Sequence, residues 1–493
     1  MSPPTLDLNN VQGDILLGLP KKGQTFFFFN INDGTIPDFC IQLGHLVPLI
    51  TTVAQVQDDQ ARISKEKEKA KAHHTNPQIL DMTGVNISFS QKGLLQLSIN
   101  DEIGDPAFTA GQFADVANFA DDPTKWDPEF KAGVHGVIYI TGSSHSLIDS
   151  QLAKVKTIFG VGGPGATITE VKVLQGHVRP GDETGHEHFG FLDGVSQPAI
   201  QGISTPANRG QETVDQGVIL LGREGDNGIV PPGGRHDADF KFLIEPEGVT
   251  RPTWALDGSF FVFRHLQQLV PEFNDFLEKN ALDVPIPILL GNPSGADLLG
   301  ARLVGRWKSG APIDLTPLKD DPAMGANPAQ NDAFRFDVSS QARCPFAAHI
   351  RKTNPRADLD AFGGTEVRRI LRRGIQFGPE VTRAEAAAKR SSTDIKLERG
   401  LLFACYQSNI VNGFQFVQQS WANNVSFPPK LGVPTPGIDP IIGQAATRAL
   451  VGVDPDVATK ELDLTAEWVV SKGGEYFFSP SISALRDTFV QAA

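Results

Sequence analysis

A short aromatic run followed by a helical pattern occurs twice in this chain, and few folds accommodate such a repeat. Residues 25–30 contain four consecutive phenylalanines, and residues 258–264 contain Phe-Phe-Val-Phe. Both runs have the length and aromatic content of a buried strand. The segments that follow them, 37–50 and 270–281, have the pattern of a helix. The repetition predicts an internal duplication and therefore an α+β fold with two similar lobes.

Other segments continue this alternation of strands and helices. We expect further strands at residues 85–89, 134–141, 166–174, 400–408 and 413–419, and further helices at residues 61–74, 91–97, 144–159 and 483–491. Residues 202–239 are rich in Gly, Pro, Asp and Asn, which predicts a long loop joining the two lobes. We therefore expect one lobe at residues 1–235 and the other at residues 236–493.

The charge of the chain argues against some classes of partner. A net charge of −13 over 493 residues makes nucleic acid and anionic membrane surfaces unsuitable partners. No apolar run approaches the roughly 18 residues of a membrane span. The first residues carry neither a basic segment nor an apolar core, so we expect no signal peptide. We expect a mature extracellular chain, with a cytoplasmic protein as the alternative.

Cysteine spacing and glycosylation triplets complete the compositional picture. Cys40, Cys344 and Cys405 form neither a disulfide framework nor a zinc-binding spacing. The Asn-x-Ser triplets at residues 86–88 and 424–426 are glycan acceptors if the chain is secreted.

The segment 185–198, Gly-His-Glu-His-Phe-Gly-Phe-Leu-Asp-Gly-Val-Ser-Gln-Pro, contains the first candidate catalytic group. Gly190 and Gly194 allow a tight backbone around Asp193, and the neighbouring Phe and Leu side chains would exclude water from its carboxylate. A carboxylate in dry, tight surroundings has a perturbed pKa, which suits acid–base chemistry. On the residues alone, an ordinary Asp-Gly turn between two elements is the more common explanation.

Residues 190–194, Gly-Phe-Leu-Asp-Gly, resemble the G-x-x-D-G signature of the dye-decolorizing haem peroxidases. The resemblance extends in the family's order from Gln12 to Gln444, and it is strongest to the fungal members. It implies two ferredoxin-like lobes, each an antiparallel sheet with peripheral helices, with haem b between the lobes. It also implies that Asp193 is the acid on the side of the haem where peroxide binds.

Haem iron needs an axial ligand, and residues 344–352, Cys-Pro-Phe-Ala-Ala-His-Ile-Arg-Lys, offer two candidates. From the residues alone, Cys344 and His349 compete, and a lone His is more often a packed side chain than a ligand. The stretch is similar to the family's Cys-Pro-Phe-Ala-Ala-His segment, which implies that His349 is the iron ligand. The same resemblance implies that Arg351 and Arg356 lie near the haem edge as partners of the propionates.

A cation is needed on the peroxide side, and residues 370–378 resemble the family segment that supplies an arginine. The match implies that Arg372 is this arginine and that Arg373 occupies a variable position. The alternative from the residues alone is a cluster of surface charges on a helix end.

Three further positions carry roles that the resemblance implies. Leu401 and Phe403 match apolar residues that cover the haem. Asp439 lies in a segment that supplies the hydrogen-bond acceptor for the iron-binding histidine, a contact that sets the tautomer and raises ligand basicity. The alternative explanation for Asp439 is an Asp-Pro turn.

Two histidines precede Asp193. The resemblance implies that His188 contacts the haem edge. His186 and His188 could instead form a two-histidine metal site on one face of a strand, but no third ligand follows at a useful spacing.

Taken together, these residues imply a peroxidase that reduces hydrogen peroxide at haem and oxidises dyes and phenols by one-electron steps. Asp193 would transfer the proton, and Arg372 would stabilise the charge that develops as the peroxide bond breaks. One alternative is a non-catalytic haem carrier that uses His349. A second alternative is a metal-dependent hydrolase that uses His186 and His188.

Bulky donors cannot enter a narrow haem channel, so their electrons must pass through an oxidisable residue. Trp421 lies among polar residues, and it matches a surface tryptophan used for long-range electron transfer in fungal relatives. The alternative is that Trp421 covers the core. Phe377 stands where some relatives carry a second, assisting tyrosine.

Overall fold

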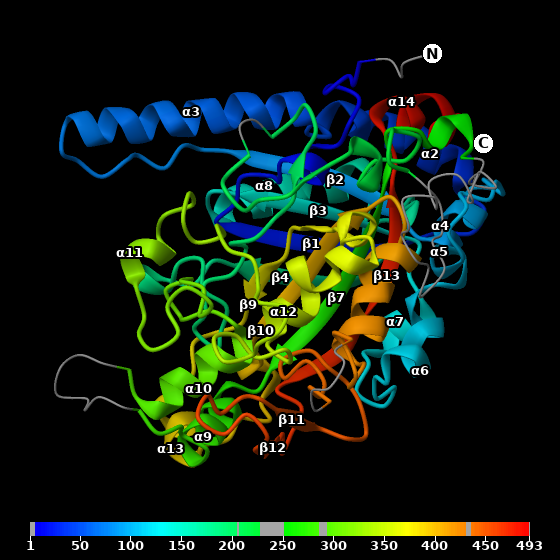
Figure 1. The fold of residues 1–493 in the computed structure, drawn as a ribbon. Helices are drawn as coiled ribbons and strands as arrows, with labels where there is room; N and C mark the ends of the chain where they lie inside the picture. Colours follow the sequence, from blue (N-terminus) through cyan, green and yellow to red (C-terminus); the bar gives the residue numbers. More distant parts are fainter. Residues whose placement is uncertain (1–4, 205–206, 227–250, 285–292, 430–434, 493) are drawn as a thin grey trace.

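The N-terminal half forms a ferredoxin-like unit in the computed structural model (Figure 1), which describes residues 5–204, 207–226, 251–284, 293–429 and 435–492. Its elements are β1 (Gly23–Ile31), α2 (Ile36–Leu46), β2 (Thr83–Phe89), β3 (Gly136–Gly142), α8 (His145–Ile158) and β4 (Ile168–His177). The strands pair antiparallel in the order β4-β1-β3-β2. Each of the two helices connects strands that are not neighbours, as in a split βαβ arrangement.

The C-terminal half repeats this arrangement. Its elements are β7 (Ser259–Gln268), α9 (Val270–Lys279), the short strands β8 (Leu371–Arg372) and β9 (Ile375–Phe377), β10 (Gly400–Gln407), the π-helical segments Val411–Gln415 and Val417–Ala422, and β13 (Val469–Ser479). The order is β13-β7-β10, with β8 and β9 both pairing with β10, and all pairs are antiparallel. The predicted internal duplication therefore appears as two units with equivalent strand orders.

The strand predicted at residues 413–419 is wrong, because this segment is helical. The chain leaves β10 here and continues to β13, which lies on the far side of β7. A crossover of this kind passes over one face of the sheet, and in the first unit α8 makes the equivalent connection. The apolar residues of the segment alternate too irregularly to separate a short helix from a strand by pattern alone.

The two units share one nine-stranded sheet. Phe478 of β13 pairs with Phe89 of β2, and the hydroxyls of Ser88 and Ser479 are hydrogen-bonded beside this seam at 2.6 Å. At the opposite edges β4 approaches β9, where a Cβ on Gly176 would lie 2.7 Å from the Gln376 carbonyl oxygen. The sheet therefore curves toward a closed barrel, which leaves few exposed edges.

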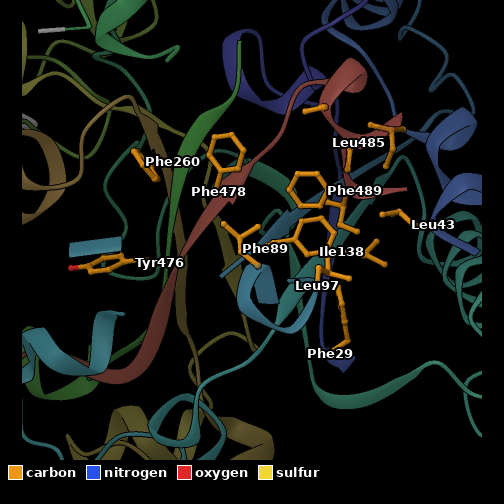
Figure 2. Close-up of a cluster of buried hydrophobic side chains, with 14 of the residues drawn as sticks. Phe29, Leu43, Phe89, Leu97, Ile138, Phe260, Tyr476, Phe478, Leu485 and Phe489 are labelled. Carbon is orange, nitrogen blue, oxygen red and sulfur yellow. The ribbon is translucent and has the colours of Figure 1, made fainter. Parts of the chain in front are cut away.

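The consecutive phenylalanines of β1 serve both faces of this sheet, because side chains alternate along a strand. Phe26 and Phe28 join the cluster inside the barrel, and Phe27 and Phe29 join the cluster beneath the helices. Figure 2 shows the second cluster, in which side chains from both units meet around Phe89 and Phe478. The predicted α+β fold with two ferredoxin-like lobes is confirmed.

The remaining elements are short and surround the two units, apart from the long helix α3, which extends away from the body in Figure 1. The helices are α1 (Gly13–Leu16), α3 (Val53–Ala72), α4 (Gln91–Gln96), α5 (Pro106–Ala110), α6 (Val116–Phe119), α7 (Pro128–Ala132), α10 (Gly295–Val304), α11 (Pro322–Gly325), α12 (His349–Thr353), α13 (Arg383–Ala388) and α14 (Ile482–Ala484). The short strands are β5 (Ala199–Ile200), β6 (Thr213–Val214), β11 (Ala449–Val451) and β12 (Glu461–Asp463).

The predicted boundary between residues 235 and 236 lies outside the described residues and stays a prediction. In the described part of the predicted loop, the regular elements are β6 and the short helical turn Gln216–Val218. No helix among the described residues is both long enough and apolar enough to span a membrane.

Replacing Phe28 by Ala should destabilise both units together. The Phe28 ring is fully buried, and it contacts Phe130, Phe263 and Phe477, with ring centroids 5.2, 5.0 and 6.3 Å away. Large-to-small changes of this type cost about 3–5 kcal/mol in unfolding free energy. We expect a lower midpoint in urea denaturation, with one transition reported by probes in either half. The control Ile41→Ala, at an exposed position on α2, should leave the midpoint nearly unchanged; an equal shift in both variants would contradict the shared core.

Candidate active site

One cavity lies against the sheet of the C-terminal unit and is lined by residues from both halves of the chain. Its apolar wall includes Leu266 of β7, Leu401 and Phe403 of β10, and Val469 of β13. The segment 187–198, which follows β4, supplies another wall. Leu401 and Phe403, for which the resemblance implies contact with the haem, therefore lie on the cavity surface.

Asp193 and Arg372 form an ion pair in this cavity. The Arg372 Nη1 donates to Asp193 Oδ1 at 2.7 Å, and the Gly194 amide donates to the same oxygen at 2.6 Å. Burial alone would raise the pKa of Asp193, but the guanidinium charge and these hydrogen bonds outweigh it and hold the pKa below its usual range. The Asp193 side chain is 30% exposed and the Arg372 side chain is 32% exposed, so both remain accessible from the cavity. The pair thus presents an ionised carboxylate beside a fixed cation.

The backbone around Asp193 needs glycine on both sides. Gly190 and Gly194 have φ values of +93° and +75°, which residues with a Cβ rarely adopt. Arg372 is held from the same segment, because the Gln197 side chain accepts from the Arg372 amide and donates to its carbonyl oxygen, each at 3.1 Å. Arg372 belongs to strand β8, so the alternative of surface charges on a helix end is wrong.

His349 and Asp439 form a second pair in the cavity wall. His349 is the first residue of α12, and its Nδ1 is 2.8 Å from Asp439 Oδ2. Burial lowers the pKa of His349, but the charge and hydrogen bond of Asp439 outweigh it and raise the pKa above the usual value. The other carboxylate oxygen of Asp439 accepts the Ile441 and Ile442 amides at 2.8 and 3.0 Å. Asp439 therefore sets the histidine tautomer and leaves Nε2 as the nitrogen available to a ligand.

Comparison with known proteins identifies the family of this site. A family model described as the DyP dimeric alpha+beta barrel domain matches residues 10–180, and one described as Dyp-type peroxidase, C-terminal, matches residues 301–426. A dye-decolorizing peroxidase of Mycetinis scorodonius is 43% identical to this chain, over 98% of the chain and 87% of the relative. The chain belongs to the dye-decolorizing peroxidase family.

Solved structures of dye-decolorizing peroxidases have the same fold. An ancestral D-type dye-decolorizing peroxidase superimposes with a TM-score of 0.86 at 54% identity, over 98% of this chain and 99% of that chain. A dye-decolorizing peroxidase in complex with 2,6-dimethoxyphenol superimposes with a TM-score of 0.84 at 42% identity, over 98% of this chain and all of that chain (100%). The family predicted from the G-x-x-D-G resemblance is confirmed.

Two residues that the resemblance placed at the haem edge are not brought to the cavity. Arg351 is fully buried on α12 and forms a two-pronged ion pair with Asp358 at 2.7 and 2.8 Å, because its side chain extends into the core behind His349. His188 is also buried, and its Nε2 lies 2.8 Å from the Phe377 carbonyl oxygen. Burial lowers the pKa of His188 to about 4, so this imidazole is neutral. Both residues position the chain around the dye-decolorizing peroxidase site instead of lining it.

The metal-site alternative gains no support in the structure. Across the described residues, no group of three or more His, Cys, Asp or Glu side chains is arranged to hold a metal ion. Cys344, the competing iron ligand, is buried beside the Arg351 side chain, and burial raises the pKa of its thiol to about 12. A neutral packed thiol is a poor metal ligand, which favours His349.

Trp421 is not a surface residue, contrary to the sequence-based expectation. Its relative exposure is 4%, because it lies in a helical segment between the rings of Phe416 and Phe427. The Phe427 ring stacks on the indole with centroids 5.2 Å apart and an angle of 11°. The local polar residues suggested exposure, but the helix directs the indole inward.

Arginines cluster on one side of the cavity. Arg306, Arg356, Arg369 and Arg372 all line it, together with the carboxylates of Asp193, Glu212 and Asp332. Arg306 and Arg356 share Asp332, and Arg369 pairs with Glu212. The Arg369 Nε is buried with no hydrogen-bond partner among the described residues. This excess of guanidinium groups suits the carboxylate groups of a bound cofactor, and the propionate contact of Arg356 stays a prediction.

Glu187 is a site residue that the sequence did not reveal as such. Its carboxylate accepts the Phe189 and Phe191 amides at 2.9 and 2.8 Å and also accepts the Gln268 side-chain amide. Burial raises the pKa of Glu187 despite these bonds. The carboxylate therefore organises the turn that carries Asp193. No sequence pattern marks Glu187 for this role, because its partners are backbone amides, which every residue except proline carries.

Replacing Glu187 by Ala should loosen this turn. The substitution leaves two inward-facing amides without acceptors, which costs about 1–3 kcal/mol for each unsatisfied group. We expect faster hydrogen–deuterium exchange at the Phe189 and Phe191 amides and a lower thermal midpoint. Glu187→Gln, which retains one acceptor oxygen, should fall between Ala and the native protein. Unchanged exchange at both amides in Glu187→Ala would show that the turn is held by other contacts.

Proposed function

We propose that this chain is a haem peroxidase that reduces hydrogen peroxide and oxidises dyes and phenols by one-electron steps. The observation that carries the proposal is the sharing of one cavity by two pairs, Asp193–Arg372 and His349–Asp439. The first pair offers a proton acceptor with an adjacent positive charge. The second pair offers an oriented imidazole of raised basicity. The two together match the requirements of peroxide cleavage at iron.

The residues present fit haem b, the cofactor on which this family depends. His349 would hold the iron through Nε2, Leu401 and Phe403 would cover the ring, and the arginine cluster would receive the propionates. When bound, haem supplies the iron at which the peroxide O–O bond breaks and stores the resulting oxidising equivalents.

Asp193 and Arg372 have separate roles in the cleavage of peroxide. The Asp193 carboxylate accepts the proton from one peroxide oxygen and delivers it to the other, so that water can leave. The Arg372 guanidinium, already within hydrogen-bonding distance of Asp193, stabilises the negative charge that develops on the leaving oxygen. Apolar side chains around them exclude bulk water and strengthen both interactions.

The substrate classes follow from the relatives. One similar peroxidase has been solved with 2,6-dimethoxyphenol, and the relatives are named for dye decolorization. Phenols and dyes are therefore the donors that we assign to this chain, with hydrogen peroxide as the oxidant. The net charge of −13 agrees with a small-molecule enzyme that binds neither nucleic acid nor anionic membranes.

An absorption spectrum tests the proposal directly. Purified protein supplied with haem should show a Soret band, and the band should change rapidly when peroxide is added. Asp193→Asn should retain the Soret band but slow the peroxide-dependent change by about 10²–10⁴-fold, because the proton acceptor is lost. Because the pKa of Asp193 lies below its usual range, the native rate should persist through mild acid and fall only as the pH approaches that pKa.

One control variant and one further test variant complete the experiment. Asp182→Asn, the same change at an exposed position before the turn, should leave the rate unchanged. Arg372→Leu should move the acid limb of the rate profile to higher pH, because the guanidinium lowers the pKa of Asp193. A haem spectrum that peroxide does not change in the native protein would favour the haem-carrier alternative. A native rate that falls between pH 7 and 6 would point to a histidine base.

We also propose that Trp421 passes electrons from bulky donors, although the side chain is buried. The carbonyl of its neighbour Ala422 accepts the Asp439 amide at 2.8 Å, and Asp439 binds His349. This short chain of contacts supports electron transfer between the indole and the cavity. The Lys352 Nζ atom, on α12, lies 5.7 Å from the centroid of the Phe427 ring that stacks on the indole. Burial lowers the pKa of the Lys352 ammonium group to about 7.

Replacing Trp421 by Phe should separate the two donor classes. The change removes the oxidisable indole but keeps an aromatic ring between Phe416 and Phe427. We expect loss of most turnover on a bulky anthraquinone dye, with peroxide-dependent spectral change and small-phenol oxidation retained. Trp254→Phe, at a position outside the cavity wall, should affect neither donor. Equal loss on both donors would indicate a folding defect, and full dye turnover would exclude Trp421 as the exit residue.

The extracellular location also remains a proposal. The triplet at residues 86–88 is not a usable glycan acceptor in the folded chain, because Asn86 is fully buried in β2. Asn424 is exposed and stays available. A glycan at Asn424 on protein recovered from the native host's culture medium would support secretion.

A further inference from the structure

Trp126 is linked to the wall of the cavity by a carboxylate. Its indole Nε1–H donates to Asp121 Oδ2 at 3.1 Å, and Asp121 lines the cavity. Both residues are buried, with relative exposures of 2% and 9%. The indoles of Trp254 and Trp307 also donate hydrogen bonds, but to Asp101 and to the Thr316 carbonyl, which are not part of the cavity wall. Among the described tryptophans, only Trp126 donates a hydrogen bond to a carboxylate of that wall.

We propose that Trp126 is a redox-active residue that gives an electron to the peroxide-oxidised enzyme, with Asp121 holding the indole proton. The inference rests on the proposed reduction of peroxide in this cavity. One electron leaves the indole and reduces the oxidised centre by one equivalent, while the N–H proton stays shared with, or moves to, Asp121 Oδ2. A reducing donor at the surface then returns one electron to Trp126, and the proton returns to the indole nitrogen.

The hydrogen bond to a carboxylate supplies the physical reason. Removing an electron makes an indole positively charged and its N–H strongly acidic, so an adjacent anion stabilises the oxidised state, especially where water is excluded. An indole bonded to a carbonyl, as in Trp307, has a weaker stabilising partner and no proton acceptor. Asp121 can perform both roles for Trp126.

Asp121 has a second partner, which forms an ion pair with its buried carboxylate. Arg264 of β7 donates from Nη2 to Asp121 Oδ2 at 2.5 Å and to Ser471 Oγ at 2.5 Å. Arg264 also lines the cavity, and its guanidinium lies 5.9 Å from the centroid of the Phe414 ring in the same wall. A buried anion without such a partner would be strongly destabilising. The Arg264 guanidinium thus compensates the buried Asp121 carboxylate, which accepts the hydrogen bond from the Trp126 indole.

Trp126 is also rigid and close to the surface. A Cβ on Gly473 would lie 3.0 Å from the indole Cε3, and the neighbouring Asp127 amide donates to the Lys472 carbonyl at 2.8 Å. The ring of Phe113, which is 40% exposed, lies with its centroid 5.5 Å from that of Trp126. The indole therefore lies between the cavity wall and an exposed aromatic surface that a donor can contact.

Electron paramagnetic resonance on freeze-quenched enzyme tests the proposal. The experiment uses haem-loaded Trp421→Phe enzyme, so that Trp421 does not contribute a signal. Peroxide should produce a protein radical whose hyperfine splitting narrows when the protein contains ring-deuterated tryptophan. Adding Trp126→Phe should abolish this tryptophan signal. Trp126→Tyr should replace it with a radical that narrows with ring-deuterated tyrosine instead.

The controls separate this inference from the proposed function. The absorption change on adding peroxide must be present in each sample; its absence in the native protein would count against the proposed function itself. A tryptophan signal that survives Trp126→Phe would overturn the inference. So would a signal in the parent Trp421→Phe enzyme that narrows only with deuterated tyrosine, since Tyr476 donates to Asp115 at 2.8 Å near the Phe414 ring. Asp121→Asn should reduce the tryptophan radical yield, and an undiminished yield would show that the carboxylate has no part.

Discussion

Charged groups around the cavity keep their positions because a buried charge must be compensated by a partner. Asp193 has Arg372, His349 has Asp439, and Asp121 has Arg264. Removing one member of such a pair leaves the other uncompensated, which costs more than the pair contributes. The site is therefore assembled from coupled side chains that come from both halves of the chain. Its geometry depends on the shared sheet, since that sheet holds the halves together.

The shared sheet gives the cavity a rigid floor. Strand β7 is paired along most of its length with β10 on one edge and with β13 on the other, and β10 also pairs with β8 and β9. Leu401 and Phe403 extend from one face of β10, and Leu402 and Ala404 extend into the barrel from the other. Because the two faces alternate along each strand, one strand can support both the core and the cavity. Small movements of the floor would disturb the barrel packing, so the floor resists them.

The sequence predicted those parts of the site that local patterns carry. Asp193 lies between glycines that its turn requires, and His349 and Arg372 lie in short segments with family resemblance. The arrangement of β1 was also predictable, because a run of phenylalanines suits a strand with two buried faces. Trp421 was placed on the surface because its neighbours are polar, but exposure depends on how a helix is oriented in the fold.

Other features depend on contacts between distant segments and leave no local pattern. Arg351 and Arg356 both follow His349, and only the fold shows that the first pairs with Asp358 in the core and the second lines the cavity. Similarly, Glu187 acts through backbone amides, which are present in every sequence. The segment at 413–419 is helical because the chain must cross over β7 there, a requirement that the duplication implies but that periodicity does not reveal.

The Arg351–Asp358 pair has a consequence for how such a protein changes over generations. Both side chains are fully enclosed, and the arginine also donates to the backbone carbonyls of Asp337, Ser340 and Cys344 just before α12. A single substitution at either position would leave a charge enclosed without its partner and disturb the approach to His349. Viable lineages must therefore retain both residues or exchange them through compensating steps, so the two positions should vary together in descendants of this sequence.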